Sequence, residues 1–191
     1  MINQINKYVR SIFERYKSGN ATEHTYRGDL QFLLETILTG ISVTNEPKRQ
    51  KCGAPDYILT KNNIPVGFIE AKDIGDNDLE GKKETGNKEQ FDRYKASLSN
   101  LIITDYLDFH LYQNGTLIEK IPVAKVLDNE IVPLAENYES FINLIKEFSS
   151  HIDQTINSPK KLAEMMAGKA RLLSDIIEKS ILSDEESLEN S

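Results

Sequence analysis

The segments Tyr57-Ile58-Leu59-Thr60 and Ile64-Pro65-Val66-Gly67-Phe68-Ile69 decide the fold of this chain. Both are rich in β-branched and aromatic residues, which favour strands. They flank Lys61-Asn62-Asn63, a polar segment that is typical of a tight turn. The sequence therefore predicts a β-hairpin centred on Asn63.

Acidic residues stand at the open end of this hairpin. A turn centred on Asn63 places Asp56 directly opposite Glu70, and cross-strand neighbours have Cβ atoms about 4.5–5.5 Å apart. Two carboxylates at this distance repel each other unless a proton or a cation lies between them. Mg²⁺ prefers oxygen ligands and works beside phosphates. The pair therefore predicts a Mg²⁺ site, in which Mn²⁺ could substitute.

Lys72 completes the pattern, because strand alternation places it on the same face as Glu70. A metal ion there can polarise a phosphodiester, and Lys72 could position the attacking water and offset charge at phosphorus. The hairpin is thus predicted to carry a hydrolytic site. A structural interpretation stays open at this point: Asp56 could cap a turn, and Glu70 and Lys72 could pair on the solvent-exposed face of a strand.

Helices and further strands are predicted on both sides of the hairpin. Apolar residues at helical spacing predict two helices in about the first 40 residues, the second ending near Gly40. Next come a short helix over 88–96, strands over 101–104, 107–112 and 116–121, and a turn at Asn114-Gly115. Two helices follow, one around 138–148 and one starting at Ser158-Pro159. We expect an α/β (α+β) fold with a small mixed sheet flanked by helices.

Composition excludes several classes of protein, but it does not identify a binding partner. The single cysteine, Cys52, excludes a disulfide framework within the chain and a multi-cysteine zinc site. No apolar run approaches the roughly 20 residues needed to span a bilayer, and the N-terminus lacks a secretory signal. We therefore expect a cytoplasmic protein that does not enter membranes. The net charge of −7 is concentrated in residues 174–191, with six acids against Lys179 alone, so it neither supports nor excludes a DNA partner.

The pattern Pro55-Asp56…Glu70-Ala71-Lys72 resembles the signature of the PD-(D/E)xK nuclease superfamily, which includes many restriction endonucleases. Longer blocks resemble the N-terminal domain of single-chain restriction–modification enzymes of types IIG and ISP: residues 22–27, 52–58, 64–75, 89–94 and 100–107. In those enzymes a nuclease is fused to an N6-adenine methyltransferase and a target-recognition domain. The resemblance covers roughly residues 20–180 and implies a restriction-endonuclease-like core.

The resemblance also implies roles for individual residues. Asp56 and Glu70 would bind the metal together with the backbone carbonyl of Ala71, and Lys72 would be the catalytic lysine. Some relatives supply a further acid near the metal from the N-terminal helices, which makes Glu23 an additional candidate ligand. The alternative for Glu23 is an acid that the helix dipole favours at a helix N-terminus.

Gln90 and Tyr94 resemble the Gln-x-x-x-Tyr motif that often follows the core in this superfamily. Residues i and i+4 share a face of a helix, so both side chains can point toward the same site. They would then contact the DNA backbone or orient the active site. Alternatively, Tyr94 belongs to the core and Gln90 to the surface.

Taken together, the sequence predicts a Mg²⁺-dependent endodeoxyribonuclease domain acting on double-stranded DNA within a restriction–modification system. Residues 1–150 would form the nuclease domain, and residues 151–191 a C-terminal helix and acidic connector toward a methyltransferase region. The chain contains neither a Gly-rich S-adenosylmethionine motif nor an Asn-Pro-Pro-Tyr motif. Methyltransferase and target-recognition domains are therefore expected partners outside this sequence. Two alternatives remain: a catalytically silent nucleic-acid-binding or docking module of the same fold, and a nuclease that acts on RNA or branched DNA.

Overall fold

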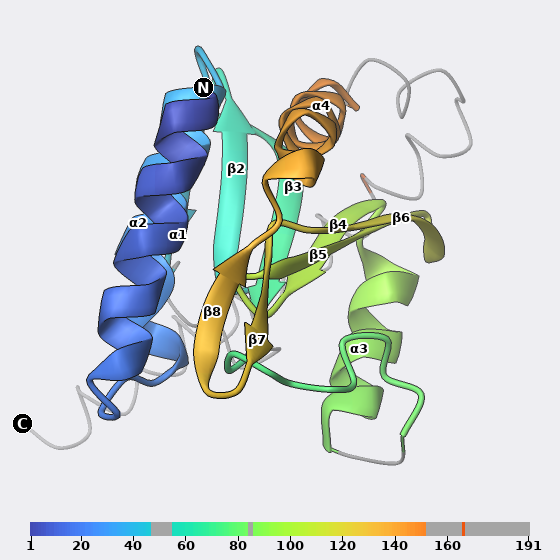
Figure 1. Cartoon of the computed structure of the whole chain (residues 1–191). Helices are drawn as coiled ribbons and strands as arrows, with labels where there is room; N and C mark the ends of the chain where they lie inside the picture. Colours follow the sequence, from blue (N-terminus) through green and yellow to red (C-terminus); the bar gives the residue numbers. More distant parts are fainter. Residues whose placement is uncertain (47–54, 84–85, 152–165, 167–191) are drawn as a thin grey trace, which may run out of the picture. The chain divides into compact units, whose positions relative to one another are not determined.

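A mixed sheet of six strands, in the order β1-β2-β3-β4-β5-β6, forms the centre of the fold (Figure 1). It is seen in a computed structural model that describes residues 1–46, 55–83, 86–151 and 166. The strands are β1 (Ser42–Asn45), β2 (Tyr57–Lys61), β3 (Ile64–Ala71), β4 (Asn100–Thr104), β5 (Asp108–Gln113) and β6 (Thr116–Pro122). Neighbouring strands are antiparallel except β3 and β4, which are parallel. Parallel neighbours need a crossover connection, which contains helix α3 (Gly86–Ser97).

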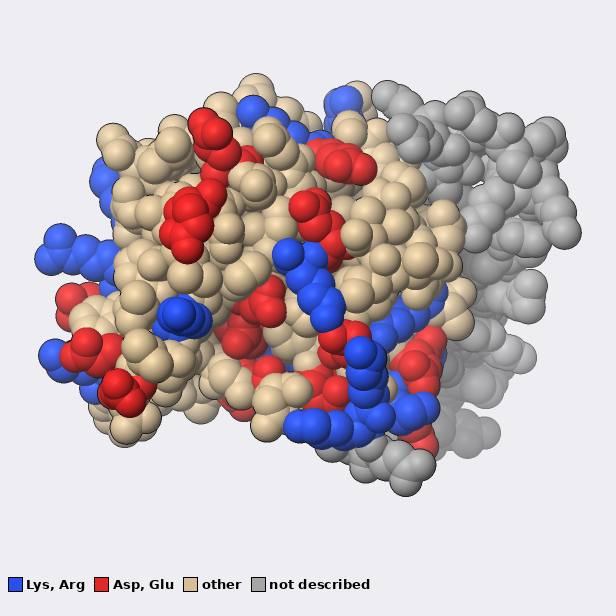
Figure 2. Space-filling model, turned by 45° about the vertical axis from the view of Figure 1, so that its right-hand side comes forward, with Lys and Arg blue, Asp and Glu red and all other residues tan. Residues whose placement is uncertain are grey.

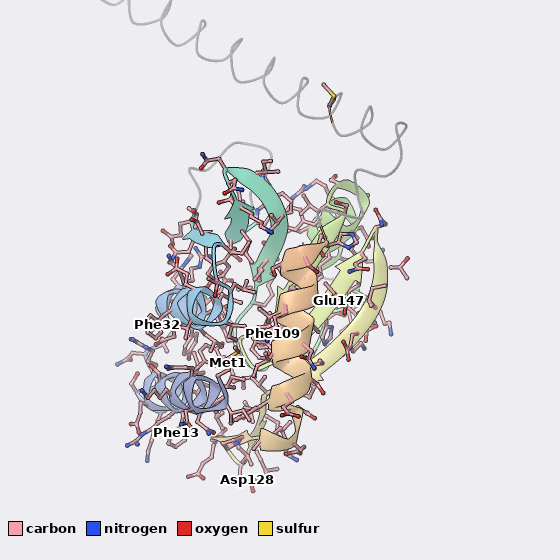
Figure 3. All side chains as sticks on the ribbon, turned by 90° about the horizontal axis from the view of Figure 1, so that it is seen from above. Met1, Phe13, Phe32, Phe109, Asp128 and Glu147 are labelled. Carbon is pink, nitrogen blue, oxygen red and sulfur yellow. The ribbon has the colours of Figure 1, made fainter. Side chains whose placement is uncertain are left out.

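Helices cover both faces of the sheet. On one face, Phe91 and Tyr94 of α3 pack against Leu101 and Ile103 of β4. On the other face, α2 (Arg27–Ile37) contacts β1 and α4 (Tyr138–Ser150) contacts β3 and β6, while α1 (Ile2–Lys17) packs against both of these helices. Viewed from above, α4 has the α1–α2 pair on one side and the green and yellow strands β4–β6 on the other (Figure 3). The two faces follow from strand alternation, which sends successive side chains to opposite sides.

Short elements complete the fold. A 3₁₀ turn, η1 (Glu23–Tyr26), leads directly into α2, and a second, η2 (Ala135–Asn137), leads into α4. The hairpin β7 (Ala124–Leu127) and β8 (Glu130–Pro133) forms a separate two-stranded sheet. Within the described part of the chain, no helix has both the length and the apolar character needed to cross a lipid bilayer.

The β2–β3 hairpin differs at its tip from the turn predicted from the sequence. Asn62 and Asn63 both have positive φ, 51° and 63°, as in the two-residue type I′ turn, whereas a three-residue turn was expected. A β-bulge then shifts the register by one residue, so that Tyr57 faces Ile69. Because the bulge compensates for the shorter turn, the open end of the hairpin keeps the predicted register.

Most predicted elements are confirmed, with shifted ends. Helix α2 ends at Ile37 rather than near Gly40, and α3 begins at Gly86 rather than at residue 88. The two-residue turn at Asn114-Gly115 is confirmed. Strands β1, β7 and β8 were not predicted, because four residues are too few to display a clear alternation. Cys52, the helix predicted from Ser158-Pro159 and nearly all of the predicted connector 151–191 lie outside the described residues.

Candidate active site

Glu70 lies one residue before the end of β3, and only 3% of its surface is exposed. Its Oε1 accepts hydrogen bonds from Lys72 Nζ and from Gln90 Nε2, each at 2.8 Å. Its Oε2 is buried and has no hydrogen-bond partner among the described residues. Because burying a charged oxygen without a partner is costly, this half of the carboxylate is suited to receive a ligand.

Lys72 follows β3 and reaches back to Glu70. Its Nζ also donates to Gln90 Oε1 at 3.0 Å and lies 5.4 Å from the centre of the Phe91 ring. Its backbone N–H donates to the Thr104 carbonyl at 2.8 Å, which fixes the chain where it leaves the sheet. Only 13% of the lysine side chain is exposed. The alternative that Glu70 and Lys72 form a solvent-exposed pair is therefore wrong, because α3 buries both.

Asp56 immediately precedes β2, at the open end of the hairpin. Its Oδ2 accepts the backbone N–H of Ala71 at 2.9 Å, a contact across the two strands. Its Oδ1 accepts a hydrogen bond from Arg27 Nη2 at 2.5 Å. The structure therefore brings Asp56, Glu70 and Lys72 to one end of the hairpin, as the register predicted.

Arg27, at the start of α2, is a member of the site that sequence reasoning missed. Its guanidinium contacts Asp56, Glu23 (2.6 Å) and Glu46 (2.8 Å), and its side chain is 9% exposed. A signal was present in the sequence: Arg27 falls on the same helical stripe as the apolar residues Leu30 and Leu34. A charged residue on an apolar helix face must find partners when the face is buried.

The other candidates occupy three different positions. Glu23 contacts the site through Arg27, and its backbone N–H donates to Asp73 Oδ1 at 2.9 Å. Gln90 bonds both Glu70 and Lys72, so it lies inside the site. Tyr94 is 4% exposed and packs in the core under α3, while its hydroxyl accepts from Gln90 Nε2 at 3.3 Å. A contact of Gln90 and Tyr94 with DNA stays a prediction.

Burial controls the charge of the two carboxylates. Burial and, to a smaller extent, the negative charge of Asp56 raise the pKa of Glu70 to about 7, although Lys72 acts to lower it. Burial also raises the pKa of Asp56, against the Ala71 N–H, which favours its ionised form. Two acids whose protons are held more tightly than usual mark a place where a cation would be stabilised.

The raised pKa of Glu70 predicts that the free energy of unfolding depends on pH. Its carboxyl keeps a proton up to about pH 7 in the folded protein, against an ordinary pKa of 4.5. Between these values the folded state binds more protons than the unfolded state, so the Glu70 contribution to the free energy of unfolding falls as pH rises. We expect the wild type to lose stability relative to Glu70→Gln across this window, by up to about 1.4 kcal/mol per pH unit. Urea unfolding without divalent cations measures this, and a difference that does not change with pH would contradict it.

The residues present fit a divalent cation by their chemistry. Asp56 and Glu70 offer carboxylate oxygens of the kind that Mg²⁺ prefers, and Glu70 Oε2 is a buried oxygen without a partner in the described structure. Among the described residues, however, no group of three or more His, Cys, Asp or Glu side chains has the arrangement of a metal site. The side-chain ligands would therefore be these two, joined by the backbone carbonyl of Ala71 that the resemblance implies.

On the described residues of the face shown in Figure 2, basic side chains do not form a uniform patch of the kind that binds a polyanion. On the face shown in Figure 2, basic side chains gather toward the lower right and are interspersed with acidic ones. Several lysines in the described structure are neutralised by neighbours, as in the pairs Lys82–Glu80 and Lys88–Asp92. The buried Glu70–Lys72 pair, rather than surface charge, therefore distinguishes this part of the described structure.

Comparison with known proteins supports the fold. Neither a family model nor a curated protein matches this chain. Among solved structures, the cryo-EM structure of a DrdV–DNA complex is similar to it, with a TM-score of 0.54 and 20% sequence identity. The similarity covers 78% of this chain and 14% of that chain, so this chain spans a small part of the protein it matches. The predicted α+β fold, a mixed sheet flanked by helices, is confirmed, and it is consistent with the expected restriction-endonuclease-like core.

Proposed function

We propose that this chain is a metal-dependent DNA endonuclease domain that belongs to a restriction–modification enzyme. One observation carries the proposal: Glu70 is buried with one oxygen bonded to Lys72 and the other without a partner in the described structure, next to Asp56. Burying an ionisable pair costs stability unless it is compensated. Such an arrangement is therefore better explained by a role in a reaction than by a contribution to stability.

Each side chain has a distinct task in this proposal. Asp56 and Glu70 would hold Mg²⁺ or Mn²⁺ together with the carbonyl of Ala71. Bound there, the ion would polarise the phosphodiester and promote ionisation of a water molecule. Lys72, fixed between Glu70 and Gln90, would place its ammonium group beside the phosphate and stabilise the charge that develops on its oxygens. Water attacks phosphorus, the bond to the 3′ oxygen breaks, and that oxygen takes a proton, which leaves a 5′-phosphate and a 3′-hydroxyl.

Double-stranded DNA is the proposed substrate. The fold resembles that of a protein solved in complex with DNA, and the sequence resembles nucleases that act on DNA. We propose that the methyltransferase and the target-recognition element belong to other domains of the same enzyme. The base sequence that is cut would then be chosen outside the residues described here.

Nicking of supercoiled plasmid by the purified 191-residue chain tests the proposal. We expect nicked and linear DNA in the presence of Mg²⁺ or Mn²⁺, and none when EDTA removes the cation. A parallel reaction with structured RNA and with branched DNA separates the remaining nuclease alternatives. Cutting that persists in EDTA would refute metal dependence.

The second candidate is a catalytically silent nucleic-acid-binding module of the same fold. The contact between Arg27 and Asp56 favours it, because a guanidinium already neutralises one of the two acids. A silent module would bind DNA without cutting it, and its DNA affinity would not depend on the carboxylates. DNA binding measured with Asp56→Asn, together with the nicking assay, distinguishes the two functions.

Gln90 offers a test of positioning inside the site. Gln90→Ala removes an acceptor from Lys72 and a donor from Glu70, so we expect cutting at saturating DNA to slow about 10- to 100-fold, as when partners of catalytic ligands are lost. Tyr94→Phe removes only the hydroxyl that lies 3.3 Å from Gln90 and should change the rate much less. If Gln90 instead contacts DNA directly, Gln90→Ala would weaken DNA binding and leave the rate at saturation unchanged.

A further inference from the structure

Arg27 enters the candidate site from the N-terminal helices and contacts three carboxylates. Nη2 lies 2.5 Å from Asp56 Oδ1 and 2.6 Å from Glu23 Oε1, and Nη1 lies 2.8 Å from Glu46 Oε1. An arginine stays protonated at any ordinary pH. The guanidinium is therefore a permanent positive charge among acids, with 9% of the side chain exposed.

The fold holds the backbone that carries this charge. Tyr57 Oη donates to the Arg27 carbonyl at 3.1 Å, and Tyr106 Oη donates to the Glu23 carbonyl at 2.7 Å. Both tyrosines are fully buried, so the start of α2 cannot move without disturbing the core. Any exchange of partners by Arg27 would therefore be a movement of its side chain alone.

The two oxygens of Asp56 are held in different ways. Oδ2 accepts a backbone N–H from β3, which belongs to the sheet and cannot give way. Oδ1 is held by the Arg27 side chain, which at the same time contacts Glu23 and Glu46. A cation that binds Asp56 Oδ1 must therefore compete with Arg27. Arg27 can release this oxygen and keep its contacts with Glu23 and Glu46.

From this geometry we infer that Arg27 is an exchangeable counter-ion of the site: it neutralises Asp56 in the cation-free protein and gives up Asp56 Oδ1 when a divalent cation binds. The inference rests on the proposed metal-dependent function and adds a regulator of cation affinity to it. Arg27 is a positioning residue here, because it acts on Asp56 rather than on the substrate. Its contact with Asp56 stabilises the empty site and lowers its affinity for the cation.

Isothermal titration of the full chain with MnCl₂, without DNA, tests the inference. Arg27→Met removes the competing charge, so we expect it to bind Mn²⁺ at least about fivefold more tightly than the wild type, within the usual range of coupling between sites. The same variant should unfold at a lower temperature without Mn²⁺ and gain more stability when Mn²⁺ is added. Arg27→Lys keeps the charge and should bind Mn²⁺ much as the wild type does. Arg10→Met, at an exposed arginine of α1, is the matched control and should leave affinity unchanged.

The Mn²⁺ affinities of the two proteins test the role of Arg27 separately from the proposed nuclease activity. Unchanged or weaker Mn²⁺ binding by a folded Arg27→Met overturns it, even if the wild type cuts DNA, and then the proposed function stands alone. Binding by Arg27→Met but not by the wild type supports it in its strongest form. If neither protein binds Mn²⁺, the inference and the metal-dependent function both fail. If affinity changes as expected but DNA is never cut, the inference holds and the nuclease proposal fails.

A measurement on the wild type covers the case in which Arg27→Met does not fold. The guanidinium signals of Arg27 in ¹⁵N NMR report its partners, and Mg²⁺ can be titrated into the same sample. We expect these signals to shift with the same saturation as Mg²⁺ binding measured by calorimetry. Saturation with Mg²⁺ that leaves the Arg27 signals unchanged would overturn the inference.

Discussion

Replacing Lys72 with alanine is expected to slow plasmid cutting by at least about 100-fold, the scale of losing one preorganised charge beside a reacting phosphate. The reason lies in the geometry: Nζ is fixed by Glu70 at 2.8 Å and by Gln90 at 3.0 Å, so the substitution removes a positioned positive charge. The initial rate of nicking, at saturating DNA and with Mg²⁺ present, measures the effect. Lys125→Ala, at an exposed lysine of β7, is the matched control and should cut like the wild type.

The same variant also has a predictable effect on stability. Lys72 is the cation that faces buried Glu70, so its loss leaves an uncompensated carboxylate wherever Glu70 is ionised. Because the pKa of Glu70 is about 7, Lys72→Ala should lose more stability at pH 8 than at pH 6. Circular dichroism then shows whether the inactive protein is still folded. An active, folded Lys72→Ala protein would refute the catalytic role of this lysine.

Gly67→Ala should be the most destabilising small substitution in β3. A Cβ at position 67 would lie 2.4 Å from Phe148 Cζ and 2.8 Å from both Cε atoms. Phe148 is fully buried in α4, so its ring cannot move away without disturbing the packing between helix and sheet. Overpacking of this kind costs about 1–3 kcal/mol, which lowers the melting temperature by roughly 2–4 °C per kcal/mol in a chain of this length.

Two further variants show whether the clash is the cause. Phe148→Leu shortens the ring side chain, so the double variant Gly67→Ala/Phe148→Leu should be more stable than the sum of the single effects implies. Gly28→Ala, in α2, meets nothing within 4 Å and should raise stability slightly, since alanine favours helices. If Gly67→Ala melts like the wild type, then α4 does not pack on β3 as described.

The local sequence pattern was sufficient to predict that Asp56, Glu70 and Lys72 lie close together. Period-two alternation put Glu70 and Lys72 on one face, and the Asn-rich turn together with the β-bulge sets the register that brings Asp56 to them. These relations depend on neighbours in sequence, which strand geometry governs directly. The turn itself was predicted with one residue too many, and the bulge that corrects the register could not be read from the sequence.

The environment of these residues arose from contacts between distant segments. Arg27 reaches Asp56 across 29 positions of sequence, and Gln90 reaches Glu70 across 20. Such contacts depend on how α2 and α3 pack against the sheet, which periodicity does not specify. Helical spacing predicted that Gln90 and Tyr94 share a face, but packing put one in the site and the other in the core.

Residue identity and local spacing thus determined which groups could act, because strand geometry leaves few choices for residues within one hairpin. Tertiary packing decided their charge and their partners. Burial by α3 raises the pKa of Glu70, and the position of α2 gives Asp56 a guanidinium instead of water. Desolvation and Coulomb interactions depend on everything within several ångströms, and that volume contains residues from distant segments, such as Arg27 and Gln90.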